Sequence, residues 1–402
     1  MDSSIFVFGI DLVDEGVDAL IESVRDRAGV DGITLAAAYH HARDFFPHNP
    51  NRKVYFHEGG TVMFRPDLKR YGVLQPVQAS MLGGRDLLDL ATRSGHHSGA
   101  RVAAWVVYLH NTRLGEQHPE HAPLTVFGDR LVTELCPSDP AVREYVRALT
   151  ADVARYEVDS IMAEALHFKT IDHGYHHERS FVELGDTSRF LLGLCFCDAC
   201  KRNAEAGGVD VGAVRSDVAA ALSMAFEGAD QMNPELDREA VCAMANGEME
   251  GYLASREASV TSLVAEAASI ARASDVRFTF SAHGGSAKRG RTTSTDSPDT
   301  SWVLGVDLAA AVSAADELEI LGYVADTADL APLVAGYTKV ARPERFAIGL
   351  RPMMPDTQSP VDLQHRVRIA SDSGASRVDF YHYALMPARN LDWIRSALDQ
   401  LH

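Results

Sequence analysis

Short apolar runs alternate with amphipathic helical patterns along the chain, and eight of these runs have the length and composition of buried strands. They are Ile5–Ile10, Gly32–Ala38, Arg101–Tyr108, Val158–Ala163, Val276–Ser281, Glu317–Tyr323, Phe346–Arg351 and Val378–Tyr383. A helical pattern follows each run. Eight strand–helix repeats predict an α/β protein with a (β/α)₈ TIM barrel.

An open, doubly wound sheet is the structural alternative to this barrel. Such a sheet would place a glycine-rich phosphate loop after an early strand. The segment Phe8-Gly9-Ile10-Asp11 does not have that pattern, so the barrel is favoured.

The length of the chain predicts large additions to the barrel. Its 402 residues compare with about 250 in a typical barrel. The extra residues follow the second to fifth strands, in connections that lie on the active-site face of such a barrel. We predict one barrel domain over 1–402, with enlarged βα loops. An extended loop at about 40–80 should hold an extra strand at Lys53–His57. A helical insertion at about 169–273 should add extra helices after strand 4, including one over Arg238–Ala273.

The charge of the chain narrows its partners. The formal net charge of −18 disfavours nucleic acid, because such a chain repels phosphate backbones. It suits a neutral sugar or a cation, although most of the acidity can be explained by solubility alone. No run approaches 18 apolar residues, so no membrane partner is expected. No basic region precedes Ile5–Ile10, which argues against a signal peptide, and we predict a cytoplasmic protein. A homo-oligomer is compatible with the sequence.

The ends of the predicted strands are rich in side chains that can do chemistry. Barrel enzymes draw their chemistry from the C-terminal ends of the strands. The candidate substrate-binding residues are Asp11, Tyr39, His40, Glu58, His110, Asn111, His167, His283, Tyr323, Arg351, Tyr381 and His382. Trp302, in a later loop, could stack on a sugar ring or serve only for packing. Glu164, at the end of the fourth strand, is the strongest catalytic candidate, because a carboxyl group at a barrel mouth can act as general acid or base. A structural salt bridge is the alternative role for Glu164.

The histidines at these strand ends allow two interpretations. Together with Glu164, five of them could assemble a divalent metal site: His40, His110, His167, His283 and His382. A polar pocket that hydrogen-bonds sugar hydroxyls would use the same side chains, and we favour this sugar pocket because no two of them form a tight ligand motif.

Four of the five cysteines flank the strand that ends in Glu164. Cys195, Cys197 and Cys200 have a spacing that can wrap one tetrahedral ion, and Cys136 could be the fourth ligand. Reduced, partly buried thiols are the alternative. Four thiolates would form a closed, structural Zn²⁺ site, and no organic cofactor is expected.

The segment at roughly residues 130–203 resembles the family 42 glycoside hydrolases, which are barrel β-galactosidases, and the looser group of glycosidase-like barrel proteins. In that family a Cys-Pro-x-x-Pro-x-x-Arg helix start precedes a strand that ends in the acid/base glutamate, and a Cys-x-Cys-x-x-Cys run follows. Here the same order appears as Cys136-Pro137, Glu164 and then Cys195 to Cys200. The resemblance implies that Glu164 is the acid/base and that the four cysteines bind structural zinc.

Three features depart from the family. Ala163 stands where the family has an asparagine that contacts the sugar 2-hydroxyl, and the later domains of the family are missing from this sequence. The family nucleophile is a glutamate at the end of the seventh strand, but the segment 348–352 contains none. A glycosidase needs a second carboxyl group, about 5–9.5 Å from the first. Asp326 is our first candidate, followed by Glu58, Asp11 and Asp356.

The sequence therefore predicts a glycoside hydrolase that acts on a small glycoside, with Glu164 as general acid/base and Asp326 as its partner. Two alternatives stay open. One is a metal-dependent sugar isomerase or lyase that uses the histidine cluster. The other is a barrel that binds a carbohydrate without turning it over.

Overall fold

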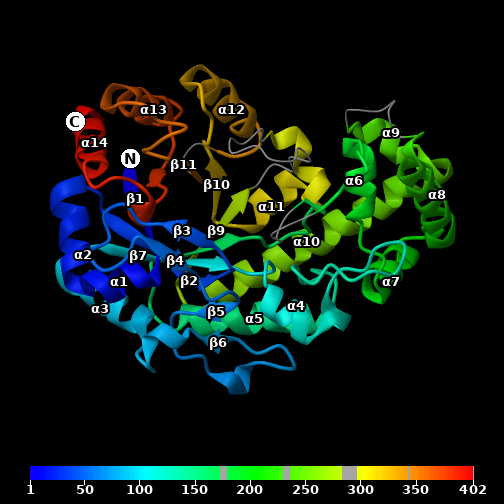
Figure 1. The fold of residues 1–402 in the computed structure, drawn as a ribbon, viewed down its shortest axis with the longest axis horizontal. Coiled ribbons are helices and arrows are strands. Elements are labelled where there is room, and N and C mark those ends of the chain that lie inside the picture. Colours follow the sequence, from blue (N-terminus) through cyan, green and yellow to red (C-terminus); the bar gives the residue numbers. More distant parts are fainter. Residues whose placement is uncertain (173–178, 230–235, 283–296, 343–344, 402) are drawn as a thin grey trace.

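A closed barrel of parallel strands forms the centre of the computed structural model, which describes residues 1–172, 179–229, 236–282, 297–342 and 345–401 (Figure 1). In these ranges eight parallel strands pair in chain order, and β1 pairs with both β2 and β12, which closes the barrel. The strands are β1 (Asp2–Val7), β2 (Gly32–Tyr39), β7 (Arg101–Val107), β8 (Ser160–Glu164), β9 (Arg277–Ala282), β10 (Glu317–Leu321), β11 (Phe346–Leu350) and β12 (Arg377–Phe380). The (β/α)₈ barrel predicted from the sequence is confirmed, and each strand overlaps one of the predicted apolar runs.

The first strand ends at Val7 rather than at Ile10, because a helix begins at Gly9. The carboxylate of Asp11 accepts a hydrogen bond from the backbone N–H of Phe8 at 2.9 Å. This bond satisfies a free N–H group at the helix start and so stabilises the early turn out of the strand.

Helices cover the outside of the barrel (Figure 1). Their bounds are α1 (Gly9–Glu15), α2 (Val17–Ser23), α3 (Leu87–Ser98), α4 (Thr112–Gln117), α5 (Pro140–Ala154), α6 (Asp186–Leu192), α7 (Asp198–Ala206), α8 (Val211–Met224), α9 (Arg238–Cys242), α10 (Glu248–Arg272), α11 (Leu308–Ala314), α12 (Leu330–Tyr337), α13 (Pro360–Asp372) and α14 (Asn390–Leu398). The large apolar core lies between these helices and the outward side chains of the strands, such as Leu318 and Ile320. No helix in the described part of the chain is both long enough and apolar enough to cross a membrane.

Small extra strands follow β2, in the loop predicted at about 40–80. The predicted strand at Lys53–His57 is present as β4 (Val54–Phe56), which pairs antiparallel with a further strand, β3 (Arg43–Phe45), that was not predicted. Two short strands, β5 (Thr61–Val62) and β6 (Val77–Gln78), extend the barrel sheet from the end of β2.

The helices between β8 and β9 build a lobe beside the barrel. Helices α6 to α9 gather there, and the long α10 runs from the lobe back along the barrel (Figure 1). A second apolar core around Phe196 and Tyr252 holds the lobe together. The single helix predicted over Arg238–Ala273 is wrong, because Ala245 and Asn246 adopt left-handed backbone angles, with φ of 51° and 56°, and separate α9 from α10.

The inner face of the barrel is polar near its base and aromatic near its mouth. Side chains alternate along each strand, so Glu317, Glu319 and Leu321 of β10 face inward. Near the base, Arg377 of β12 pairs with Asp379 at 2.9 Å and with Glu317. Closer to the mouth the inward residues are large and aromatic, and they surround the candidate site.

Candidate active site

A small cavity of about 100 Å³ lies at the C-terminal ends of the strands. It is lined by Phe6, Tyr39, His40, Trp105, Met162, Glu164, Ser281, Leu321, Tyr323 and Tyr381. Five of these residues were predicted from the sequence: Tyr39, His40, Glu164, Tyr323 and Tyr381. The barrel brings them together because the ends of its parallel strands converge on one face.

Glu164 is the last residue of β8, and its side chain lines this cavity. The indole N–H of Trp105, on the adjacent strand β7, donates a hydrogen bond to Glu164 Oε2 at 2.6 Å. Burial raises the pKa of the Glu164 carboxyl group, against the opposing effects of the Lys169 ammonium and the Trp105 hydrogen bond. A carboxyl group with a raised pKa keeps its proton closer to neutral pH, which is what a general acid requires.

Aromatic rings form most of the cavity wall. The ring of Trp105 makes edge contacts with Phe6 and Tyr39, at centroid distances of 5.1 and 4.9 Å. Tyr381 packs against Phe6 at 5.5 Å and against Tyr323 at 5.7 Å. A hydrogen bond joins the side chains of Tyr39 and Tyr381. The wall therefore combines apolar ring surfaces with hydroxyl groups.

Burial lowers the pKa of three histidines near this wall, His40, His167 and His382. His40 stacks on His110 with centroids 4.4 Å apart, and burial lowers the pKa of His40 to about 4. His167 Nδ1 lies 2.6 Å from the carbonyl oxygen of Phe168, and burial lowers its pKa to about 3. His382 is fully buried and stacks on Phe8 at 3.8 Å, with a pKa well below its usual range because of burial. His283 lies outside the described residues.

Arg351 positions a residue of the cavity. Its guanidinium group binds the carboxylate of Asp356 through two hydrogen bonds of 2.6 and 2.8 Å. The same group lies 4.4 Å from the centroid of the Tyr323 ring. The pair thus fixes Arg351 over Tyr323, one of the rings that line the cavity.

The four predicted cysteines form a buried cluster beside the barrel. The sulfur atoms of Cys195, Cys197 and Cys200 lie 3.7, 3.6 and 3.5 Å from that of Cys136. Four thiolates around one tetrahedral Zn²⁺ at about 2.3 Å would lie about 3.8 Å apart. The four sulfur atoms all lie within 4.8 Å of one another, so they could bind one metal ion together. Within the described ranges, no other group of three or more His, Cys, Asp or Glu side chains meets this condition. The cluster therefore has the donors and nearly the spacing of a metal site.

Solved structures with a similar fold include three enzymes that are named after carbohydrate substrates. The β-galactosidase of the psychrophilic Marinomonas ef1 has a TM-score of 0.56 at 11% identity, and the match covers 100% of this chain and 60% of that one. The α-L-fucosidase isoenzyme 2 of Paenibacillus thiaminolyticus has a TM-score of 0.54 at 12% identity, and the match covers 100% of this chain and 49% of that one. The catalytic domain of the Paenibacillus polymyxa β-amylase has a TM-score of 0.52 at 10% identity, and the match covers 99% of this chain and 97% of that one.

These likenesses show the barrel fold. The chain spans about half of the fucosidase and three fifths of the β-galactosidase. No protein-family model and no curated protein matches the sequence. The finer resemblance to family 42 stays a prediction.

Several predicted residues have structural contacts and do not line this cavity. Asp326 is exposed and accepts a hydrogen bond from the N–H of Ala328 at 2.9 Å as a helix cap. Asn111 caps α4 in the same way, with a bond of 3.0 Å from Leu114. Glu58 accepts a hydrogen bond from the backbone N–H of Ser80 at 2.8 Å, and Arg113 lies 3.3 Å from it. Trp302 is buried in the second core, 4.9 Å from the ring of Phe190.

Two residues of interest were missed by the sequence analysis. Trp105 lies inside a predicted strand rather than at its end, and its contact with Glu164 depends on strand pairing. Glu319 is fully buried inside the barrel, and neither carboxyl oxygen has a hydrogen-bond partner among the described residues. A Cβ atom built on Gly349 would lie 3.3 Å from Glu319 Oε1 and 3.6 Å from the Tyr323 hydroxyl, so both groups occupy the space that this glycine leaves. The sequence did contain a signal for Glu319, because Glu317 and Glu319 alternate with apolar residues along β10.

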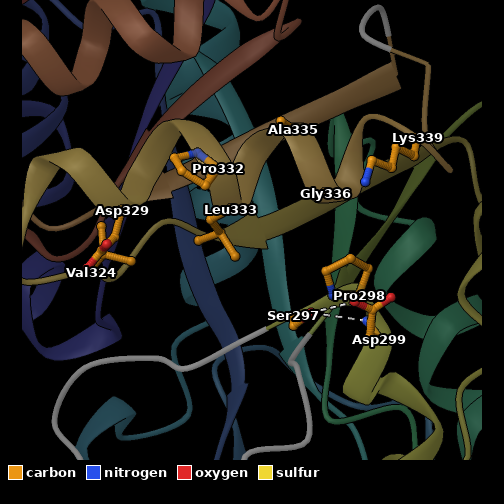
Figure 2. Close-up of a pocket in the computed structure, with 10 residues that line it drawn as sticks. All are labelled: Ser297, Pro298, Asp299, Val324, Asp329, Pro332, Leu333, Ala335, Gly336 and Lys339. Carbon is orange, nitrogen blue, oxygen red and sulfur yellow. Dashed lines mark hydrogen bonds between the residues drawn. The ribbon is translucent and has the colours of Figure 1, made fainter.

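A larger cavity of about 510 Å³ lies between the start of the 3₁₀ helix Pro298–Leu304 and α12 (Figure 2). It shares no lining residue with the Glu164 cavity. The charged groups among its described lining residues, Asp299, Asp329 and Lys339, are all exposed.

Proposed function

We propose that this protein is a glycoside hydrolase that acts on a small glycoside and uses Glu164 as its general acid/base. The observation that supports this most is the Glu164 carboxyl group itself. It lies in the cavity at the barrel mouth, its pKa is raised by burial, and Trp105 fixes it with a 2.6 Å hydrogen bond. A positioned carboxylic acid of this kind can protonate the oxygen of a leaving group.

The cavity wall suits a sugar ring. A pyranose has apolar faces and a rim of hydroxyl groups, and the wall offers aromatic rings together with Tyr39, Tyr323 and Tyr381 hydroxyls. The neutral imidazole of His40 adds a further hydrogen-bonding group. The cavity of about 100 Å³ favours one small ring over a bulky ligand. The similar enzymes named above act on carbohydrates according to their names, which agrees with this proposal.

The second carboxyl group has two candidates. Asp326 remains the prediction from the sequence, although its side chain caps a helix. Glu319 is the second candidate, because it lies inside the barrel beside Tyr323 and its pKa is raised mainly by burial, with Glu164 among the charges that contribute. Gly349 of β11 leaves room for it on the strand where the family 42 nucleophile would lie.

Turnover of 4-nitrophenyl glycosides tests the proposal. Replacing Glu164 by glutamine keeps the shape but removes the transferable proton, so we expect turnover to fall roughly 10²- to 10⁴-fold with an unchanged melting temperature. The matched control is Glu205→Gln on the exposed face of α7, which should keep full activity. Full activity in Glu164→Gln would refute the assignment. Asp326→Asn and Glu319→Gln, made in parallel, identify the partner as the variant that also loses turnover.

The same assays separate the rival functions. A metal ion that EDTA removes together with activity would favour the isomerase or lyase. A sugar that raises the melting temperature without any product would favour a binding protein.

We also propose that the four clustered cysteines bind a structural Zn²⁺, as the resemblance to family 42 implies. The support is their burial and the sulfur–sulfur distances of 3.5–3.7 Å from Cys136. Four thiolates fill a tetrahedral zinc site completely, so the ion would hold elements together rather than take part in catalysis.

A further inference from the structure

A second cavity, of about 200 Å³, lies on the same side of the barrel as Glu164. One wall comes from the segment before Cys136 and includes Leu131, Thr133 and Glu134. The other comes from the segment after β8 and includes Phe168 and Lys169. Among the described residues, the linings of this cavity and of the Glu164 cavity do not overlap.

Glu134 is the unusual group in this cavity. Its side chain lines the cavity, the residue is 4% exposed, and neither carboxyl oxygen has a hydrogen-bond partner among the described residues. Burying a polar group without a partner destabilises a fold, so such groups are rare in native proteins unless a ligand, ion or water satisfies them.

Backbone pairing and ring stacking connect this cavity with the Glu164 cavity. The backbone of Glu134 pairs with that of His110, whose ring stacks at 4.4 Å on His40 in the wall of the first cavity. The two cavities are therefore neighbours at the barrel mouth.

The lining selects a neutral, hydroxyl-rich ligand. Arg130 and Lys169 line the cavity and would repel a cation, although the Arg130 guanidinium group already donates hydrogen bonds to the carbonyl oxygens of Glu120 and Ala122. The Glu134 carboxyl group would in turn disfavour an anion. A hydroxyl group can donate to the carboxyl group and accept from the Lys169 ammonium. The side chains of Leu131 and Phe168 give the cavity apolar surface as well, and a sugar ring combines an apolar face with hydroxyl groups.

We propose that the Glu134 cavity is a binding subsite for a second sugar ring, so that the substrate is a neutral glycan of at least two residues. The subsite rests on the proposed function for the identity of its ligand. In this arrangement the ring in the first cavity presents its glycosidic bond to Glu164, and the neighbouring ring satisfies the carboxyl group of Glu134.

Binding measurements on two variants test the subsite without requiring turnover. Calorimetry and thermal shift would compare 4-nitrophenyl monoglycosides with neutral disaccharides, including lactose and cellobiose, in the Glu164→Gln background. Adding Glu134→Leu should weaken disaccharide binding at least tenfold and leave monoglycoside binding within twofold. The same change should raise the melting temperature of the free protein, because an apolar side chain replaces an unpartnered carboxyl group.

Other outcomes would overturn the proposal. If Glu134 is structural, Glu134→Leu lowers the melting temperature and weakens both ligand types equally. If no disaccharide binds more tightly than its monoglycoside, the cavity is not a sugar subsite. Glu205→Leu, on the exposed face of α7, is the matched control and should bind both ligands as the parent does. These binding measurements do not require hydrolysis. They therefore test the subsite even if the protein does not hydrolyse any glycoside.

Discussion

Burial raises the pKa of the proposed acid Glu164, and the hydrogen bond from Trp105 opposes this rise. A donor bonded to a carboxylate stabilises its ionised form, so this bond holds the pKa of Glu164 below the level that burial alone would give. Trp105→Phe keeps an aromatic ring and removes the N–H, and we expect a higher pKa for Glu164. A ¹³C NMR titration of the Glu164 carboxyl group measures this, and the alkaline limb of the pH–activity profile should move in the same direction. Trp393→Phe on α14 is the matched control, and an unmoved titration in Trp105→Phe would show that the bond has no such role.

At the scale of single residues, the sequence predicted half of the cavity lining. Tyr39, Glu164 and Tyr381 could be identified because terminal residues of parallel strands must meet on one face. Trp105 and Glu319 could not, because their contacts depend on which faces of neighbouring strands align, and periodicity alone does not give strand register.

Some polar residues near strand ends cap helices instead of lining the cavity, and the sequence alone does not distinguish these two roles. Asn111 and Asp326 satisfy backbone N–H groups at helix starts, which any short polar side chain near a helix start can do. His382 packs on the ring of Phe8 instead of reaching the cavity wall. Residue type therefore indicated where chemistry could occur, and local packing decided which side chains were available.

At the scale of elements, the cysteine cluster joins the chain before α5 to the start of α7. Cys136 lies four residues before α5 begins at Pro140, and Cys200 lies inside α7. If a Zn²⁺ ion holds these elements, Cys197→Ser should lose the bound zinc and lower the melting temperature by several degrees, because metal binding contributes directly to folding. Cys242→Ser removes the fifth cysteine, which lies outside the cluster, and should keep both. Elemental analysis would measure the zinc content of the two variants, and calorimetry would measure their melting temperatures. Equal zinc content in both variants would contradict the proposed site.

The elements that the sequence predicted well are those whose burial leaves a continuous apolar pattern. Most of the barrel strands contain such a run, since parallel strands are covered on both faces, although β10 and β12 also carry buried charged residues. The break between α9 and α10 has no such signal, because Ala245 is a good helix former that adopts a left-handed conformation only in its folded surroundings. The two short strands β5 and β6 were likewise too brief to produce a pattern.

At the scale of the whole molecule, buried ionisable groups determine how stability varies with pH. Burial raises the pKa of Glu134 from 4.5 to about 8, and it also raises the pKa of Glu164 and Glu319. The native state therefore holds these protons more tightly than the unfolded chain, and the stability they provide is lost as pH rises, for Glu134 between about 4.5 and 8. His40 and His167 act in the opposite sense. Their pKa falls from 6.5 to about 4 and about 3, so they reduce stability as pH falls below 6.5.

These opposing contributions predict the shape of the stability curve. Between pH 4.5 and 6.5 the carboxyl groups and these two histidines act in opposite directions, whereas above pH 6.5 Glu134 still titrates and the two histidines do not. We therefore expect the melting temperature to decline from about pH 6.5 to pH 8. Glu134→Gln should flatten this decline, since an amide does not titrate, and Glu205→Gln on the surface should leave it unchanged. Thermal unfolding across this pH range tests the expectation. An equal decline in both variants would mean that Glu134 is ionised in the native protein throughout the range, with a partner that compensates its burial.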